Sequence, residues 1–168
     1  MKIAVIGYSG AGKSTLAKIL ADRLCLPLLY LDKIQFTANW SERNRPEALA
    51  MVEHFLEQEH WVIDGTYPEF LLQRRLEEAD QILFLDFNRF ICLRQAFCRY
   101  LSCRGTVRES VSEGCIERFD REFFRWLIWD GRSRKRVLAF RSIIQHWPEK
   151  TVVLKNRKQV TAYLMKQL

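Results

Sequence analysis

The residues with the clearest chemical signature form one short run near the N-terminus. Gly7 and Gly12 are separated by four residues and are followed directly by Lys13 and Ser14. This spacing suits a loop that wraps a phosphate group with backbone N–H groups, because glycine permits positive φ and close approach. Lys13 would then reach the β- and γ-phosphates of ATP, and the Ser14 hydroxyl would hold Mg²⁺. The predicted contacts are Gly7, Ser9, Gly10, Ala11, Gly12, Lys13, Ser14 and Thr15.

The flanking segments supply the elements that such a loop needs. Residues 2–6 form an apolar run, typical of a buried parallel strand, that stops at Gly7. After the loop, apolar residues from Leu16 to Leu24 recur at helical spacing, so a helix N-terminus would point at the bound anion. The strand before and the helix after the run support the interpretation of a phosphate-binding loop.

The same strand and helix patterns alternate along the chain. Four further strands are predicted at 28–31, 61–63, 82–85 and 152–154, and helices at about 46–59, 68–78 and 157–167. Residues 88–147 are predicted to form several helices broken near Gly105, Gly114 and Gly131. Alternation of this kind predicts an α/β fold, a five-stranded parallel sheet with helices on both faces, in one domain over 1–168.

Three acidic residues follow predicted strands. Asp32, Asp64 and Asp86 each stand where a strand ends, and ligands bind beyond the carboxyl ends of strands in open parallel sheets. We therefore predict a site role for Asp32, and for Asp64 a role as a direct or indirect partner of Mg²⁺. Asp86 is equally well explained as a site residue or as a helix cap.

The positive charge is concentrated in one segment. The net charge is +7, yet residues 89–141 carry 13 basic and 6 acidic side chains, and 12 of those 13 are arginine. Arginine binds phosphate through a planar fork of donors, so the cluster as a whole favours contact with phosphate. A solvated helical face, with the nearby acids as partners, is the better explanation for any single arginine.

The composition excludes several classes of protein. The uncharged apolar runs are too short to span a bilayer, and the N-terminus lacks the pattern of a secretory signal, so a cytoplasmic protein is expected. The five cysteines are predicted to be reduced thiols, because they are odd in number and include no Cys-x-x-Cys pair. Four of them, at 92, 98, 103 and 115, leave a zinc-stapled flap as a minor alternative, since their spacing matches no paired-thiolate pattern.

Together these residues resemble the small P-loop kinases of the adenylate kinase type, and among them the bacterial DNA topology modulation proteins. The resemblance covers nearly the whole chain through residues 7–15, Leu31-Asp32, residues 61–67, and the stretch from Glu117 to Trp129. It implies an acceptor-binding region at about 36–59 and a mobile, arginine-bearing lid at about 95–135. It also implies catalytic roles for Lys13 and for Arg94 and Arg99 near the base of the lid.

The resemblance implies further roles at the ends of other strands. Asn156 and Arg157, after the last strand, stand where these folds hold adenine. Asp32 resembles the position at which small kinases with hydroxyl acceptors place a general base, which would take the proton from the attacking hydroxyl. Further lid candidates, which we do not rank, are Arg125, Arg132, Arg134 and Arg136.

One departure from the family pattern concerns the acceptor. Nucleoside monophosphate kinases usually follow the third strand with Asp-Gly, an aromatic residue, Pro and a phosphate-binding Arg, whereas this chain is one residue longer and carries Glu69 there. Arginines elsewhere are possible substitutes or simply solvated charges: Arg43, Arg45, Arg74 and Arg75. The pattern slightly favours a hydroxyl acceptor and leaves a phosphate acceptor open.

Aromatic residues in the acceptor region and the lid have two explanations. Phe123, Trp126 and Trp129 stand at helical spacing and are predicted to pack in the core. Trp40 lies in a polar stretch, and its role is open between packing and ligand contact.

The favoured function is an ATP- and Mg²⁺-dependent kinase acting on a nucleotide or other small molecule, as a monomer or homodimer. The alternative is a nucleotide-binding regulator that contacts nucleic acid through the basic C-terminal half. The kinase is favoured because lid arginines explain the same charge, and the sequence carries no nucleic-acid-binding motif.

Overall fold

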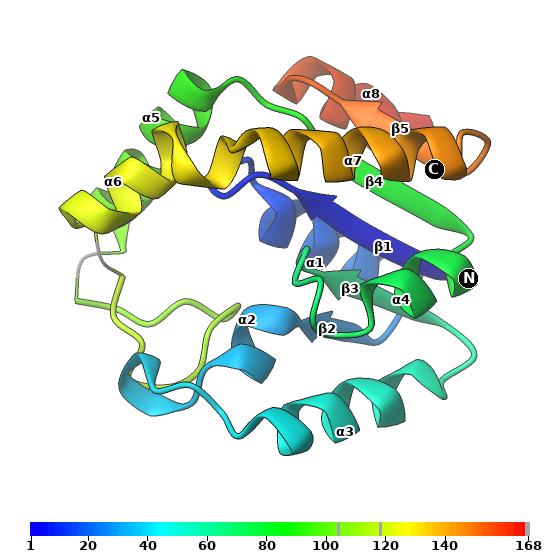
Figure 1. The fold of residues 1–168 in the computed structure, drawn as a ribbon, viewed down its shortest axis with the longest axis horizontal. Coiled ribbons are helices and arrows are strands. Elements are labelled where there is room, and N and C mark those ends of the chain that lie inside the picture. Colours follow the sequence, from blue (N-terminus) through cyan, green and yellow to red (C-terminus); the bar gives the residue numbers. More distant parts are fainter. Residues whose placement is uncertain (104, 118, 167–168) are drawn as a thin grey trace.

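The computed structural model describes residues 1–103, 105–117 and 119–166. Its strands are β1 (Lys2–Gly7), β2 (Leu28–Tyr30), β3 (Trp61–Asp64), β4 (Gln81–Leu85) and β5 (Thr151–Leu154). They form one sheet in the order β2-β3-β1-β4-β5, in which every neighbouring pair is parallel (Figure 1). The predicted five-stranded parallel sheet is confirmed.

The helices account for most of the remaining chain. The α-helices are α1 (Lys13–Leu24), α2 (Leu31–Gln35), α3 (Arg45–Leu56), α4 (Leu72–Glu78), α5 (Arg89–Ser102), α6 (Arg121–Ile128), α7 (Arg134–His146) and α8 (Arg157–Lys166). Two short 3₁₀ helices are η1 (Ala38–Trp40) and η2 (Asp130–Arg132). None of the helices in the described part of the chain is long and apolar enough to cross a membrane.

The strand order explains why helices cover both faces of the sheet. From β1 to β2 the chain moves in one direction across the sheet, and from β3 to β4 it moves in the other. Because crossovers between parallel strands are right-handed, α1 and α4 must lie on opposite faces. Figure 1 shows α1 behind the sheet, with α4 and α7 in front of it.

The core lies on both faces of the central strand. Ile3, Ala4, Val5 and Ile6 of β1 are fully buried, as a parallel strand covered on both sides requires. The register places Val5 beside Asp64 of β3, and β1 also lies beside β4. The carboxyl ends of these three strands therefore meet at the edge where β1 runs into the phosphate loop, which we define as residues 7–14.

The structure corrects two local predictions and removes one of the two explanations left open for Asp86. Asp32 lies in the first turn of α2, since the strand before it already ends at Tyr30. The helix expected from residue 68 begins at Leu72, because Leu71 adopts a left-handed backbone with φ 52° that a continuous helix does not contain. The residue that caps α5 is Asn88, whose side chain accepts a hydrogen bond from the Phe90 N–H, so Asp86 is not that cap.

The arginine-rich segment is less helical than predicted. Between α5 and α6 the described residues form no helix, whereas helices broken near Gly105 and Gly114 were expected. Both glycines have positive φ, and Val107 and Ile116 form an isolated antiparallel bridge that folds the segment back on itself. The break near Gly131 is confirmed, since η2 separates α6 from α7.

Candidate functional site

The phosphate loop is shaped by glycines that no other residue could replace. Gly7 has φ 139°, and a Cβ there would lie 2.5 Å from the carbonyl oxygen of Leu85. Gly10 has φ 76°, and a Cβ there would lie 2.6 Å from the carbonyl oxygen of Cys92. Both distances are below any real carbon contact, so β4 and α5 press the loop into a conformation that requires glycine.

A threonine after β3 holds the start of this loop. The Thr66 hydroxyl accepts a hydrogen bond from the Gly7 N–H at 3.1 Å and donates one to the Gly7 carbonyl oxygen at 3.2 Å. Thr66 was not among the site residues predicted from the sequence. The only indication in the sequence was its position just after Asp64 and Gly65, at the end of β3. This strand pairs in parallel with β1, which brings its end beside the loop.

Lys13 lies over the loop that precedes it. Its ammonium donates a hydrogen bond to the carbonyl oxygen of Tyr8 at 3.1 Å. Lys13 begins α1, and Gly12 just before it has the left-handed conformation of φ 91°. The lysine ammonium and the N-terminus of α1 thus lie beside the loop, an arrangement that suits a bound phosphate.

Asp64 is buried beside the first residues of α1. Burial raises the pKa of its carboxyl to about 6, and the positive charge of Lys13 and the nearby Ser14 hydroxyl oppose this rise. Its Oδ1 atom has no hydrogen-bond partner among the described residues. A buried carboxylate oxygen without a partner, next to a hydroxyl, is a donor set that fits Mg²⁺.

Asp32 faces the same edge of the sheet. The phenolic hydroxyl of Tyr67 donates a hydrogen bond to Asp32 Oδ1 at 2.7 Å. Burial, followed by the charge of Asp32, raises the pKa of Tyr67, so the phenol stays protonated and remains a donor. The negative charge of Asp32 also raises the pKa of Asp64, so the two carboxyl groups lie within electrostatic reach.

Arg99 meets two residues that the sequence did not assign to the site. Its Nη2 atom lies 2.6 Å from Glu117 Oε1, and its Nε donates a hydrogen bond to the same oxygen at 2.7 Å. The other carboxylate oxygen of Glu117 lies 2.6 Å from Nε of Arg108. Glu117 is buried, with 4% of its side chain exposed, so one carboxylate bridges an arginine of α5 and an arginine of the segment that follows it.

A cavity of about 1010 Å³ opens between α5 and the start of α8. Four predicted site residues line it: Arg94, Arg99, Asn156 and Arg157. Apolar groups contribute as well, among them Phe87 and Ile91. The cavity has room for a nucleoside and combines apolar walls with cationic groups, as nucleotide sites do.

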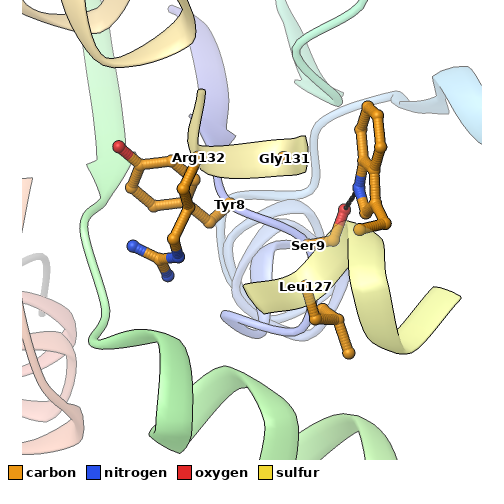
Figure 2. A pocket seen from close by; sticks show the side chains of 6 residues that line it. Tyr8, Ser9, Leu127, Gly131 and Arg132 are labelled. Carbon is orange, nitrogen blue, oxygen red and sulfur yellow. Dashed lines mark hydrogen bonds between the residues drawn. The ribbon is translucent and has the colours of Figure 1, made fainter. Parts of the chain in front are cut away.

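The outer side of the phosphate loop is covered by α6 and η2 (Figure 2). Trp126 Nε1 donates a hydrogen bond to the Ser9 hydroxyl at 3.1 Å. The guanidinium of Arg132 stacks over the ring of Tyr8, 3.7 Å from its centroid. The space left between these groups holds only about 10 Å³, so this side of the loop is packed rather than open.

Of the other aromatic residues, Trp40 joins η1 to the segment between α5 and α6. Its N–H group on the ring donates a hydrogen bond to the carbonyl oxygen of Ile116 at 2.9 Å, and its ring packs edge-on against Phe36. Trp129 is 58% exposed, so the prediction that it packs in the core is wrong. Trp129 lies at the end of α6, beyond the turns that bury Leu127 and Ile128.

The further arginine candidates differ in their contacts. Arg136 of α7 stacks on the ring of Trp126. Arg125 of α6 pairs with Asp130 of η2. Arg134 is exposed at the first position of α7. Arg132 thus contacts the loop directly through Tyr8, and Arg136 contacts it through Trp126.

The arginines considered as substitutes in the acceptor region have internal partners. Arg75 is fully buried and donates to the carbonyl oxygens of Phe70, Gly65 and Tyr67 at 2.7 to 2.9 Å. Arg45 lies 3.9 Å from Glu69, the acid at the departure from the family pattern. The remaining two pair with glutamates: Arg43 with Glu47 and Arg74 with Glu78.

The cysteines form no cluster. All five are free thiols, and Cys92 and Cys115 are buried. Within residues 1–103, 105–117 and 119–166, no group of three or more His, Cys, Asp or Glu side chains is placed to hold a metal ion. Cys115 instead donates to the carbonyl oxygen of Thr37, so it attaches the segment between α5 and α6 to the residues that follow α2.

Comparison with known proteins identifies the fold. No protein-family model and no curated protein matches the chain. Solved structures do match: shikimate kinase from Acinetobacter baumannii in complex with shikimate is 15% identical, with a TM-score of 0.53 over 99% of this chain and 89% of that one. Shikimate kinase from Bacteroides thetaiotaomicron is 16% identical, with a TM-score of 0.52 over 99% and 96%.

A second kind of kinase has the same arrangement. Deoxyadenosine kinase from M. mycoides with bound dATP is 15% identical, with a TM-score of 0.51 over 99% of this chain and 98% of that one. Identities this low establish the fold alone. The chain has the P-loop NTPase fold found in these small kinases.

Proposed function

We propose that the protein is an ATP-dependent phosphotransferase that moves the γ-phosphate of ATP to a small-molecule acceptor. The phosphate loop binds the β- and γ-phosphates through its N–H groups and Lys13. Ser14 and Asp64 hold Mg²⁺, which supplies charge neutralisation for the phosphate oxygens when it is bound. The observation that carries this proposal is the unpartnered Oδ1 of buried Asp64 beside Ser14 and Lys13.

The proposed base is Asp32. Its carboxylate takes the proton of an acceptor hydroxyl as that oxygen attacks the phosphorus, and the hydrogen bond from Tyr67 fixes its orientation. A phosphate acceptor needs no such base. Glu69 stands where nucleoside monophosphate kinases carry their phosphate-binding arginine, which also favours a hydroxyl.

The substrates occupy two regions in this proposal. The nucleoside of ATP lies in the cavity lined by Arg94, Asn156 and Arg157, and the acceptor lies over residues 36–59. Residues 95–135 form the lid, whose Arg99 stabilises the charge that spreads over the phosphoryl oxygens during transfer. A closed lid also excludes water and so protects ATP from hydrolysis.

The kinase neighbours agree with this proposal without fixing the acceptor. Their names state activity on shikimate and on deoxyadenosine, two compounds that bear hydroxyl groups. The resemblance to the DNA topology modulation proteins remains a family hypothesis carried by the motifs of residues 7–15 and 61–67.

A nucleotide-binding regulator that contacts nucleic acid is less well supported. Arg99 and Arg108 pair with Glu117, and Arg132 stacks on Tyr8, so part of the basic surplus is used inside the protein. Binding to nucleic acid through exposed cations would weaken steeply with salt, and a flat response between low and moderate salt would reject it.

The test is conversion of ATP to ADP by the purified protein with Mg²⁺, against a panel of nucleosides, sugars, small hydroxy acids and monophosphates. We expect turnover with a hydroxyl acceptor, lost in Lys13→Ala and Asp32→Asn. The matched control is Asp22→Asn, which removes an exposed carboxylate on α1 and leaves the rate unchanged. ATP binding without turnover across the whole panel would count against the kinase.

A further inference from the structure

The bridge between Arg99, Arg108 and Glu117 has the form of an occupied ligand site. Two guanidinium groups from separate segments converge on the two oxygens of one carboxylate. Two oxygens of a phosphate group present the same arrangement of acceptors to an arginine fork. Glu117 therefore lies where a phosphate oxygen pair would be bound by the same two arginines.

The half of the bridge that Arg108 forms is poorly aligned. Nε of Arg108 lies 2.6 Å from Glu117 Oε2, yet both atoms are buried and neither is aligned for a hydrogen bond with any described residue. The contact is an ion pair in which the N–H group and the oxygen are poorly aligned. A tetrahedral oxyanion, whose oxygens point in more directions than those of a carboxylate, would satisfy this N–H group.

The location connects the bridge to the proposed reaction. Arg99 lines the 1010 Å³ cavity and so lies between that cavity and Glu117. Burial lowers the pKa of Arg99 first, the neighbouring Arg108 lowers it further, and the charges of Glu117 and Asp32 oppose both effects. Two adjacent cations in this setting require an anion, whether from the protein or from a ligand.

The carboxylate comes from a segment that is able to withdraw without unfolding a helix. Glu117 follows Ile116, whose only described regular pairing is the isolated bridge to Val107. Ile116 is also held by the ring N–H of Trp40. Movement of Glu117 therefore changes the surroundings of Trp40, which makes that indole a reporter.

We propose that Arg99 and Arg108 form an oxyanion-binding site, separate from the phosphate loop, that the carboxylate of Glu117 occupies until a phosphate group displaces it. The assignment of that phosphate group to ATP or to the acceptor depends on the proposed function. The existence of the site does not, because phosphate binding is measured without any turnover.

The first experiment titrates inorganic phosphate by calorimetry into the protein, alone and with MgADP filling the phosphate loop. We expect Glu117→Gln to bind phosphate at least tenfold more tightly than the wild type, because both arginines lose their internal anion. Glu117→Asp keeps the negative charge and stays near the wild type. Adding Arg108→Gln to Glu117→Gln removes the gain, which separates this site from the loop.

A folded Glu117→Gln protein that binds phosphate no more tightly than the wild type overturns the proposal. So does a gain that survives Arg108→Gln. Failure of MgADP to bind would instead contradict the proposed function. The oxyanion site would still be tested in that case, because the titration without nucleotide compares the same variants.

A second measurement uses the wild type, in case Glu117→Gln does not fold. With MgADP filling the phosphate loop, phosphate is expected to change the intrinsic fluorescence of the wild type, and the change is expected to disappear in Trp40→Phe, which lacks the bond to Ile116. A signal that stays flat through the titration, or one that Trp40→Phe retains, contradicts the displacement of Glu117.

The source of the phosphate is then separated by competition in Glu117→Gln. A non-hydrolysable ATP analogue in place of MgADP blocks phosphate binding if the site takes the γ-phosphate. If phosphate still binds beside the analogue and a nucleoside monophosphate displaces it, the site belongs to the acceptor.

Discussion

The phenol of Tyr67 donates a hydrogen bond to the carboxylate of Asp32 at 2.7 Å, across 35 positions of sequence. The two residues follow β3 and β2, which are neighbours in the sheet. The bond holds one carboxylate oxygen in place and leaves the other for a ligand. A base for phosphoryl transfer needs this kind of fixed orientation.

Removal of that phenolic hydroxyl is expected to slow the chemical step. Tyr67→Phe keeps the ring but loses the hydrogen bond to a charged group, worth about 1.5 kcal/mol, so kcat should fall roughly tenfold. KM for ATP should not change, since the phosphate loop is untouched. Steady-state kinetics measure both constants, and an unaltered kcat would show that Asp32 needs no support from Tyr67.

The loss of the Thr66 hydroxyl is expected to weaken nucleotide binding. Thr66→Ala removes both hydrogen bonds to Gly7, at a cost of about 1 kcal/mol, which corresponds to a roughly fivefold rise in the Kd of ATP. Thr66→Ser keeps the hydroxyl and serves as the matched control. Equal affinities of the two variants in a titration would contradict this role.

Asp64 is expected to reduce stability in the absence of metal. Its pKa rises from 3.8 to about 6 in the folded protein, so folding disfavours the charged form. Stability contributed by this group is therefore greatest below pH 4 and declines as the pH rises through 6. At pH 7.5, Asp64→Asn should stabilise the metal-free protein by about 1–3 kcal/mol.

Denaturant unfolding at pH 7.5 and at pH 4 measures this difference, which should vanish at the lower pH. The same variant should lose the Mg²⁺ dependence of ATP binding, because an amide is a poorer ligand for Mg²⁺. A variant that is less stable than the wild type at pH 7.5 would contradict the burial argument.

Arg75 is expected to be the most sensitive arginine for stability. Its buried guanidinium holds three carbonyl oxygens between β3 and α4, and burial lowers its pKa to about 10. Arg75→Met leaves these carbonyls without donors and should cost about 3 kcal/mol or more. The adjacent Arg74→Met breaks only a surface pair and should cost less than about 1 kcal/mol in the same unfolding experiment.

Local patterns predicted the phosphate loop and the sheet because their causes are local. Glycine spacing sets the backbone of residues 7–14, and apolar runs mark strands that are covered on both faces. Asp64 was also identifiable, since it ends a strand that must lie near β1. The roles of these residues as catalysts or ligands remain predictions.

The contacts of Arg108, Glu117 and Thr66 follow from pairing between distant segments. From the sequence alone, Glu117 would be interpreted as an exposed surface charge. It is buried because residues 105–117 fold against α5. Arg75 has the sequence environment of a solvated helix charge, yet the left-handed turn at Leu71 brings three carbonyls around it. Composition and periodicity carry no information on such pairings.

The attachment of residues 105–117 to residues 36–40 has a consequence for how these two segments move. Cys115 donates to the carbonyl oxygen of Thr37, and Ser112 donates to that of Phe36, while the same segment carries Arg108 and Glu117. Withdrawal of this segment from the phosphate side therefore also breaks its contacts with residues 36–40. In the proposed kinase, opening of this segment and rearrangement of residues 36–40 would therefore occur as one movement.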